Sequence, residues 1–92
     1  MDFNVQKTGE ALQGAVMRLA PGEASGPKGN EHADSEQILY VVEGQIEGEI
    51  GDRTITLHPG ESVIVPKGVA HRFTNATNRP VVTFNAYAPP AY

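Results

Sequence analysis

The sequence predicts a single all-β domain, a sandwich or barrel built from short strands. Ten glycines and seven prolines in 92 residues separate short apolar runs, and this spacing is typical of strands joined by turns. Several runs alternate polar and apolar residues with a period of two, which turns one face of a strand toward a core. We expect no helix of useful length and no internal repeat. Strands at this spacing favour the sandwich and barrel classes.

The first half of the chain contains two candidate strands separated by a long loop. Residues 14–20 (GAVMRLA) form the first strand. Residues 21–30 are rich in glycine and proline and show no periodicity, so we expect a loop there. Residues 37–44 (QILYVVEG) are rich in β-branched and aromatic side chains, and Gly44 ends this second strand.

A hairpin is the clearest local prediction. From residue 45 to residue 50 (QIEGEI), polar side chains alternate with isoleucine and glycine, so the strand has one wet face and one dry face. Gly51-Asp52 suits a two-residue hairpin turn, and residues 53–57 (RTITL) alternate again on the return strand. A second turn, HPGE at residues 58–61, leads to the next strand; we expect His58 to be exposed there.

Two further strands follow, joined by a tight turn. The run SVIVP ends at Pro66, because proline cannot donate a hydrogen bond to a sheet ladder. Gly68 suits the turn, and the next strand carries His71 and Phe73 on the same face. One histidine is therefore directed from a strand toward whatever that face lines.

The last strand is predicted at residues 80–87 (PVVTFNAY), before prolines that cannot extend a ladder. Asn85 and Tyr87 share one face of this strand because side chains alternate along it. We expect both side chains, together with Phe73, to line an interior cavity.

The predicted domain spans residues 1–92, with an N-terminal segment at 1–13, a barrel at 14–88 and a tail at 89–92. A chain of this length has a small core, because it buries only about 60–65% of its unfolded surface. Pairing with a second copy would bury more surface, so we expect a homodimer.

Composition and charge limit the possible partners and compartments. A net charge of −4 and seven scattered basic residues argue against a nucleic-acid surface. No apolar run approaches the roughly 18 residues of a membrane-spanning helix, and no secretory signal is visible at the N-terminus. The absence of cysteine excludes disulfides and cysteine zinc sites. We expect a cytoplasmic protein that binds neither nucleic acid nor membrane.

The most informative stretch is residues 60–75, which read GESVIVPKGVAHRFTN. This stretch resembles the second conserved motif of the cupin superfamily, G-x5-P-x-G-x2-H-x3-N, at every defined position. The resemblance implies the cupin fold, a double-stranded β-helix or jelly-roll antiparallel barrel that is open at one end. It also implies that His71 faces the barrel interior, and cupins commonly form dimers.

Residues 30–44 (NEHADSEQILYVVEG) resemble the first cupin motif, G-x5-H-x-H-x3–4-E-x6-G, incompletely. Counted back from Gly44, the acidic position of the motif falls on Gln37. The second histidine position is then His32, and the first histidine position is Asn30.

Glu36 is an alternative to Gln37, at the shorter spacing that the motif permits. Neighbouring residues of a strand point to opposite faces, so only one of the two can look inward unless a bulge intervenes. The register set by Gly44 and by Tyr40-Val41 favours Gln37.

In cupins, three histidines and one glutamate typically bind a divalent metal such as iron, manganese, nickel, zinc or copper. Transferred by position, the resemblance implies a centre formed by His32, His71, Gln37 and Asn30. None of these four donors carries a negative charge, so we expect weaker metal binding than in a complete cupin centre.

Two functions are consistent with these residues. The chain is either a small metalloenzyme of the isomerase, lyase or dioxygenase type, acting on a small polar substrate such as a sugar or keto acid, or a non-catalytic cupin that binds a small ligand or regulates another protein. The missing first histidine and the missing glutamate favour the second function. The retained pair, His32 and His71, favours the first.

Overall fold

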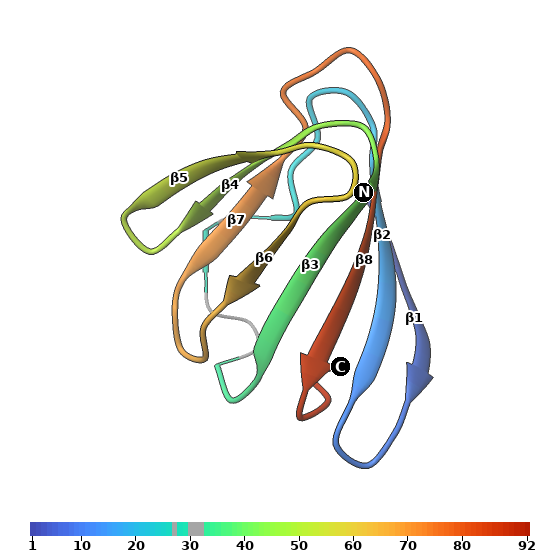
Figure 1. Cartoon of the computed structure of the whole chain (residues 1–92), viewed down its shortest axis with the longest axis vertical. Helices are drawn as coiled ribbons and strands as arrows, with labels where there is room; N and C mark the ends of the chain where they lie inside the picture. Colours follow the sequence, from blue (N-terminus) through green and yellow to red (C-terminus); the bar gives the residue numbers. More distant parts are fainter. Residues whose placement is uncertain (27, 30–32) are drawn as a thin grey trace.

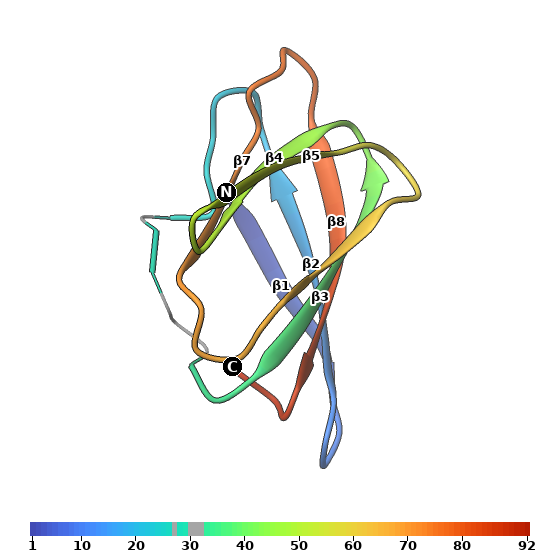
Figure 2. The ribbon, with the colours of Figure 1, turned by 60° about the vertical axis from the view of Figure 1, so that its left-hand side comes forward.

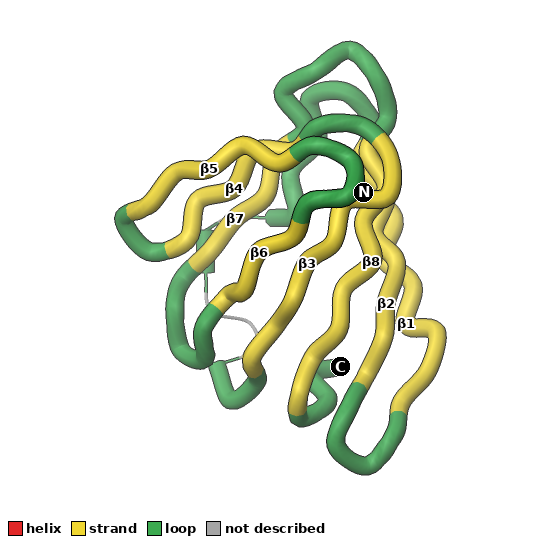
Figure 3. Tube along the Cα trace, in the orientation of Figure 1, coloured by secondary structure: helices red, strands yellow, loops and turns green. Residues whose placement is uncertain are grey.

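The computed structural model describes residues 1–26, 28–29 and 33–92. These residues form eight strands and no helix (Figure 3). The strands are β1 (Asp2–Thr8), β2 (Gln13–Leu19), β3 (Glu36–Glu43), β4 (Ile46–Ile50), β5 (Arg53–Leu57), β6 (Ser62–Val65), β7 (His71–Thr74) and β8 (Val81–Ala88). The predicted all-β class is confirmed. In the described part of the chain, no helix is available that could cross a membrane.

The strands form two antiparallel sheets that face each other. The larger sheet has the order β1-β2-β8-β3-β6, and the smaller one has the order β5-β4-β7. Figure 1 shows the smaller sheet beside β6, on the opposite side of the view from β1, and Figure 2 shows it in front of the larger sheet. The chain crosses between the sheets four times, from β3 to β4, from β5 to β6, from β6 to β7 and from β7 to β8. This is the predicted double-stranded β-helix, or jelly-roll, arrangement.

Apolar side chains from both sheets meet between them. Buried and exposed positions alternate along β3, β4 and β8, which is the period of two that the sequence predicts. The core consists of Met17, Leu19, Leu39, Val41, Ile46, Ile50, Leu57, Val65, Phe73 and Val81. Gly48 permits the close packing of β4 against β7, because a Cβ atom at Gly48 would lie only 2.9 Å from Phe73 Cε1.

The predicted hairpin and the end of the second motif both have structural roles. Gly51 has a φ of 61°, and the turn that it begins joins Ile50 to Arg53 in the register of a two-residue hairpin.

Asn75, the last residue of the motif, is buried and donates from Nδ2 to the carbonyls of Leu19 (3.1 Å) and Arg79 (2.6 Å). The first bond ties the loop after β7 to the end of β2, and the second closes that loop. Backbone bonds of Asn75 with Gly22 and Glu23 join it to the loop after β2, which lies beside it at the top of Figure 1.

The N-terminal residues contain a strand that the sequence analysis does not predict. β1 pairs along β2, with Phe3 opposite Met17 and a register shift between Val5 and Lys7. All of its side chains except that of Phe3 are exposed, because β1 lies at the edge of the sheet. An edge strand with a wet surface lacks the alternation that reveals a half-buried strand. The tail after β8 contains no strand, as predicted.

Candidate functional site

A cavity of about 140 Å³ lies between the two sheets. Its walls are supplied by inward positions of the larger sheet, by β7, by the loop before β3 and by both ends of the chain. The lining residues are Met1, Phe3, Met17, Ser25, Gly29, Gln37, His71, Phe73, Asn85, Tyr87 and Tyr92. The predicted cavity residues Phe73, Asn85 and Tyr87 are all among them.

The phase of β3 places Gln37 in the cavity and Glu36 outside it. Gln37 is 4% exposed, whereas Glu36 and Ile38 on either side are exposed. The bulge that could have reversed this phase lies further along, between Val41 and Glu43. The register predicted from the motif is therefore correct, and the alternative with Glu36 inward is wrong.

Gln37 belongs to a buried chain of amides and a hydroxyl on β3 and β8. Its Nε2 donates to Asn85 Oδ1 (3.0 Å), and Asn85 Nδ2 donates to Thr83 Oγ1 (3.0 Å). These bonds orient the Gln37 amide with its oxygen away from Asn85. Gln37 Oε1 is buried and has no hydrogen-bond partner among residues 1–26, 28–29 and 33–92. A buried acceptor without a donor is costly, so this oxygen is suited to a ligand.

His71, the first residue of β7, is oriented by its own loop. Its Nδ1 lies 3.0 Å from the carbonyl oxygen of Val69. Because a carbonyl only accepts, Nδ1 carries a proton, and Nε2 is the ring nitrogen that can act as a metal ligand. A backbone carbonyl that holds one ring nitrogen in this way is the usual support for a metal-binding histidine.

The loop before β3 runs along β7 and extends the smaller sheet. Isolated bridges join Ala24 to Thr74 and Gly29 to His71. The hydroxyl of Ser25 accepts from the backbone N–H of Phe73 (2.9 Å). These contacts hold the described end of the loop beside His71. The predicted ligands Asn30 and His32 lie outside the described residues, so their positions are not assigned.

One side of the cavity is aromatic, and most of it is missed by the sequence analysis. Phe3 lies 6.4 Å from Tyr87 and 4.8 Å from Tyr92 between ring centroids, and Tyr87 lies 5.1 Å from Tyr92. Met1 and Met17 complete this side. The sequence pattern predicts only Tyr87 at this position, because β1 lacks a strand signal and Tyr92 falls in the tail after the predicted barrel. The sole signal in the sequence is an aromatic residue near each end of the chain.

His58 is exposed in the turn before β6, as predicted, and it does not line the cavity. Its backbone N–H donates to Glu61 Oε1 (2.7 Å), and its Nδ1 lies 3.1 Å from the same oxygen. These two contacts lower the pKa of Glu61 below its usual value of 4.5. This pair is a turn contact rather than a binding site.

The described donors suit a divalent transition metal, but they do not form a complete ligand set. Gln37 supplies an unpaired oxygen and His71 an imidazole nitrogen to one cavity, and both are donors that transition metals accept. No group of three His, Cys, Asp or Glu side chains suited to a metal occurs in the described part of the chain. A fuller set depends on Asn30 and His32, so the four-residue centre stays a prediction.

Comparison with known proteins identifies related sequences and folds. The model of the cupin domain family (Cupin_2) matches residues 15–87. The sequence is 36% identical to "Polyketide synthase CurC" of Streptomyces cyaneus and 38% identical to "Protein SchB" of Streptomyces halstedii. Each match spans 61 residues, which are 66% of this chain but only 37% and 41% of the two relatives. The chain thus matches about two fifths of their length.

Solved structures show the same architecture. The structure of BH2720 from Bacillus halodurans matches with a TM-score of 0.89 and 28% sequence identity. The match covers 98% of this chain and 71% of the other.

Proposed function

Because the chain belongs to the cupin domain family, we propose that its cavity binds a small oxygen-bearing molecule through a divalent transition metal. His71 and Gln37 hold the metal from the described part of the cavity. His32 and Asn30 supply the remaining protein donors. Iron, manganese, nickel, zinc and copper all accept this mixture of nitrogen and oxygen ligands.

The unpaired oxygen of Gln37 carries this proposal. The amide is anchored through Nε2 to Asn85, so its oxygen cannot turn away without breaking that bond. A cation in the cavity would satisfy an oxygen that otherwise stays buried and unpaired. His71 adds a nitrogen whose tautomer is set by Val69. Both side chains are thus oriented before any ligand arrives.

When bound, the metal supplies a Lewis acid that polarises an oxygen of the ligand. The protein residues bind and orient: Asn85 holds Gln37, and Phe73 with the aromatic side limits the access of water. The likeness to a protein named as a polyketide synthase favours a ketone or enol as substrate class, over a sugar or keto acid. Isomerase, lyase and dioxygenase reactions all act on such oxygen-bearing groups.

A second function, ligand binding without catalysis, is favoured by the neutrality of the site. The described side chains that line the cavity include no carboxylate. Glu36, the nearest carboxylate in the motif, faces outward. The described part of the cavity therefore supplies no carboxylate that could act as a general base. It also supplies no negative charge to balance the charge of a bound metal.

Elemental analysis of protein purified without chelator tests metal binding. We expect about one equivalent of transition metal per chain, either as purified or after reconstitution. His71→Ala should abolish this metal while circular dichroism still reports the β fold. His58→Ala is the matched control, because His58 is exposed outside the cavity, and it should retain the metal.

Less than about a tenth of an equivalent after reconstitution would overturn the metal proposal and leave the metal-free binding function. Loss of the β signal in His71→Ala would instead make His71 a structural residue.

A further inference from the structure

The fully buried amide of Gln13 fastens the C-terminal tail to the first hairpin. Gln13 is 1% exposed. Its Oε1 accepts from the backbone N–H groups of Ala91 (3.0 Å) and Tyr92 (2.8 Å). Its Nε2 donates to the carbonyl of Tyr92 (2.7 Å) and to Thr8 Oγ1 (2.9 Å). Three of the four hydrogen bonds of this amide therefore hold the tail, and the fourth joins it to Thr8.

This fastening places the ring of Tyr92 on the wall of the cavity. The rings of Phe3, Tyr87 and Tyr92 lie within 4.8 to 6.4 Å of one another between centroids. The pair Tyr87–Tyr92 is T-shaped, with 77° between the planes, so the cluster presents both ring faces and ring edges. Aromatic side chains prefer such offset and edge-to-face partners, and a ligand ring would be attracted by the same geometry.

The polar groups of the cavity lie next to one end of the aromatic cluster, because Tyr87 and Asn85 are both on β8 and Tyr87 is opposite Gln37 on β3. Phe3 is on the edge strand β1, whereas Gln37 is on β3, with β2 and β8 between them. Asn85 and His71 add further polar groups beside Gln37, from β8 and β7. The cavity thus offers both an aromatic and a polar region.

The volume limits what can fill both regions at once. The cavity measures about 140 Å³, and an apolar protein cavity of about 150 Å³ is known to hold benzene. One six-membered ring with small substituents therefore matches this volume.

We infer that the cavity selects a ligand with a single planar aromatic ring that carries its oxygen substituents on one edge, as a phenol or catechol does. The ring lies against Phe3, Tyr87 and Tyr92, and the oxygens face Gln37 and His71. This inference rests on the proposed function in taking the cavity as the ligand site, but it does not require the metal. Tyr92 is then a specificity-determining residue, and Gln13 is the positioning residue that holds it.

Titration of the metal-stripped full chain with phenol and with cyclohexanol tests the inference. The two probes are similar in size and carry one neutral hydroxyl each. Phenol differs in its aromatic ring and in the greater donor strength of its hydroxyl, and the Tyr92 variants below separate these two effects. Chemical shifts of the cavity residues report binding. We expect phenol to bind more tightly by about threefold to tenfold, the size of an aromatic pairing effect.

Variants of Tyr92 and Gln13 distinguish the effect of the aromatic ring on ligand preference from the effect of apolar volume alone. Tyr92→Leu keeps apolar volume and should remove the preference for phenol, whereas Tyr92→Phe should retain it. Gln13→Ala should weaken the preference without changing the metal content. His58→Leu is the control, because His58 is exposed in the turn before β6, outside the cavity, and should not affect binding.

Equal binding of the two probes by the wild-type chain, or no binding of either, would overturn the inference. A preference for phenol in a chain that binds no metal would overturn the metal proposal alone. Metal binding without that preference would overturn the inference and leave the metal proposal standing.

Discussion

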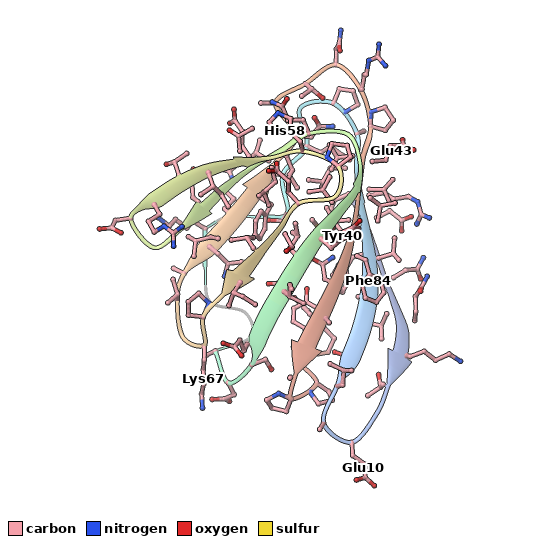
Figure 4. The ribbon with its side chains drawn as sticks, viewed as in Figure 1. Glu10, Tyr40, Glu43, His58, Lys67 and Phe84 are labelled. Atoms are coloured by element: carbon pink, nitrogen blue, oxygen red, sulfur yellow. The ribbon has the colours of Figure 1, made fainter. Side chains whose placement is uncertain are left out.

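Beside the cavity, the larger sheet buries polar side chains on its inner face and exposes apolar side chains on its outer face. On the inner face, Gln37 and Asn85 are buried beside the cavity. On the outer face of the same two strands, Ile38, Tyr40 and Phe84 are 40%, 44% and 40% exposed. Figure 4 shows Tyr40 and Phe84 side by side over β3 and β8. Buried polar side chains and clustered exposed apolar side chains are both typical of surfaces that contact a ligand or a partner. Each face of the sheet therefore indicates a binding surface.

The outer apolar side chains form one continuous patch across four strands. Ile38 is opposite Ile64 on β6, Tyr40 is opposite Phe84 on β8, and Phe84 is opposite Val16 on β2. Val42 extends the patch along β3.

Gly14 shapes the β2 end of this patch. A Cβ atom there would lie 2.9 Å from Phe84 Cζ, so the glycine lets the ring lie on the sheet. A side chain at this position would push the Phe84 ring away from β2.

We propose that a second copy of the chain covers this outer face. Four strands about 4.8 Å apart, with eight residues of about 3.3 Å each in the longest, present a face of roughly 19 by 26 Å. A face of this extent, about 500 Å² in projection, supplies more than half of the roughly 800 Å² that each partner buries in a small stable interface. A self-complementary patch is what a two-fold dimer requires.

Two neighbouring substitutions on β3, one on each face of the sheet, should show the largest difference in their effect on stability. Leu39→Ala empties a fully buried core position and should lower the free energy of unfolding by about 2–5 kcal/mol. Ile38→Ala removes a half-exposed side chain and should cost about 1 kcal/mol or less in the isolated chain. Denaturant unfolding at low protein concentration measures both. Similar losses would show that Ile38 is buried even in the monomer.

A charge placed in the outer patch should break the dimer. Light scattering after size exclusion should give twice the chain mass for the wild type and one chain mass for Phe84→Glu. A carboxylate buried without a partner costs several kcal/mol, so the dissociation constant should rise by at least about a hundredfold.

Thr56→Glu is the matched control, because Thr56 is exposed on β5 in the other sheet, and this variant should remain dimeric. A wild-type chain that is monomeric at tens of micromolar would contradict the proposal.

The smallest effect is expected at Glu61, which belongs to neither face and serves as a reference for an exposed polar contact. Its folded pKa is lowered from 4.5 by the backbone N–H and ring of His58. A lowered folded pKa stabilises the native state above pH 4.5, and this contribution is lost as the pH falls through the folded pKa. Glu61→Gln should therefore unfold at a slightly lower temperature than the wild type at about pH 7 and at the same temperature at about pH 3. A difference of equal size at both pH values would exclude a charge effect.

Most of the fold and part of the site could be predicted because their signals are local. Alternation with a period of two identified β4, and the spacing of the first motif, counted back from Gly44, gave the inward phase of Gln37. Gly51 identified a turn, since a positive φ favours glycine. Motif spacing then placed His71 at the start of a strand that faces the interior. These features depend on a few adjacent residues, so the sequence alone determined them.

The tertiary structure alone decided how distant segments complete the cavity. Gln13 binds the backbone of Tyr92 across 79 positions of the chain, and Gln37 binds Asn85 across 48. Neither contact has a periodic signal, because each depends on which strands become neighbours in the sheet. The polar edge strand β1 likewise acquires its role only by pairing with β2. Local sequence patterns thus predict the barrel and the direction of His71. The aromatic wall and the unpaired oxygen of Gln37 form only when distant strands pair in the folded chain.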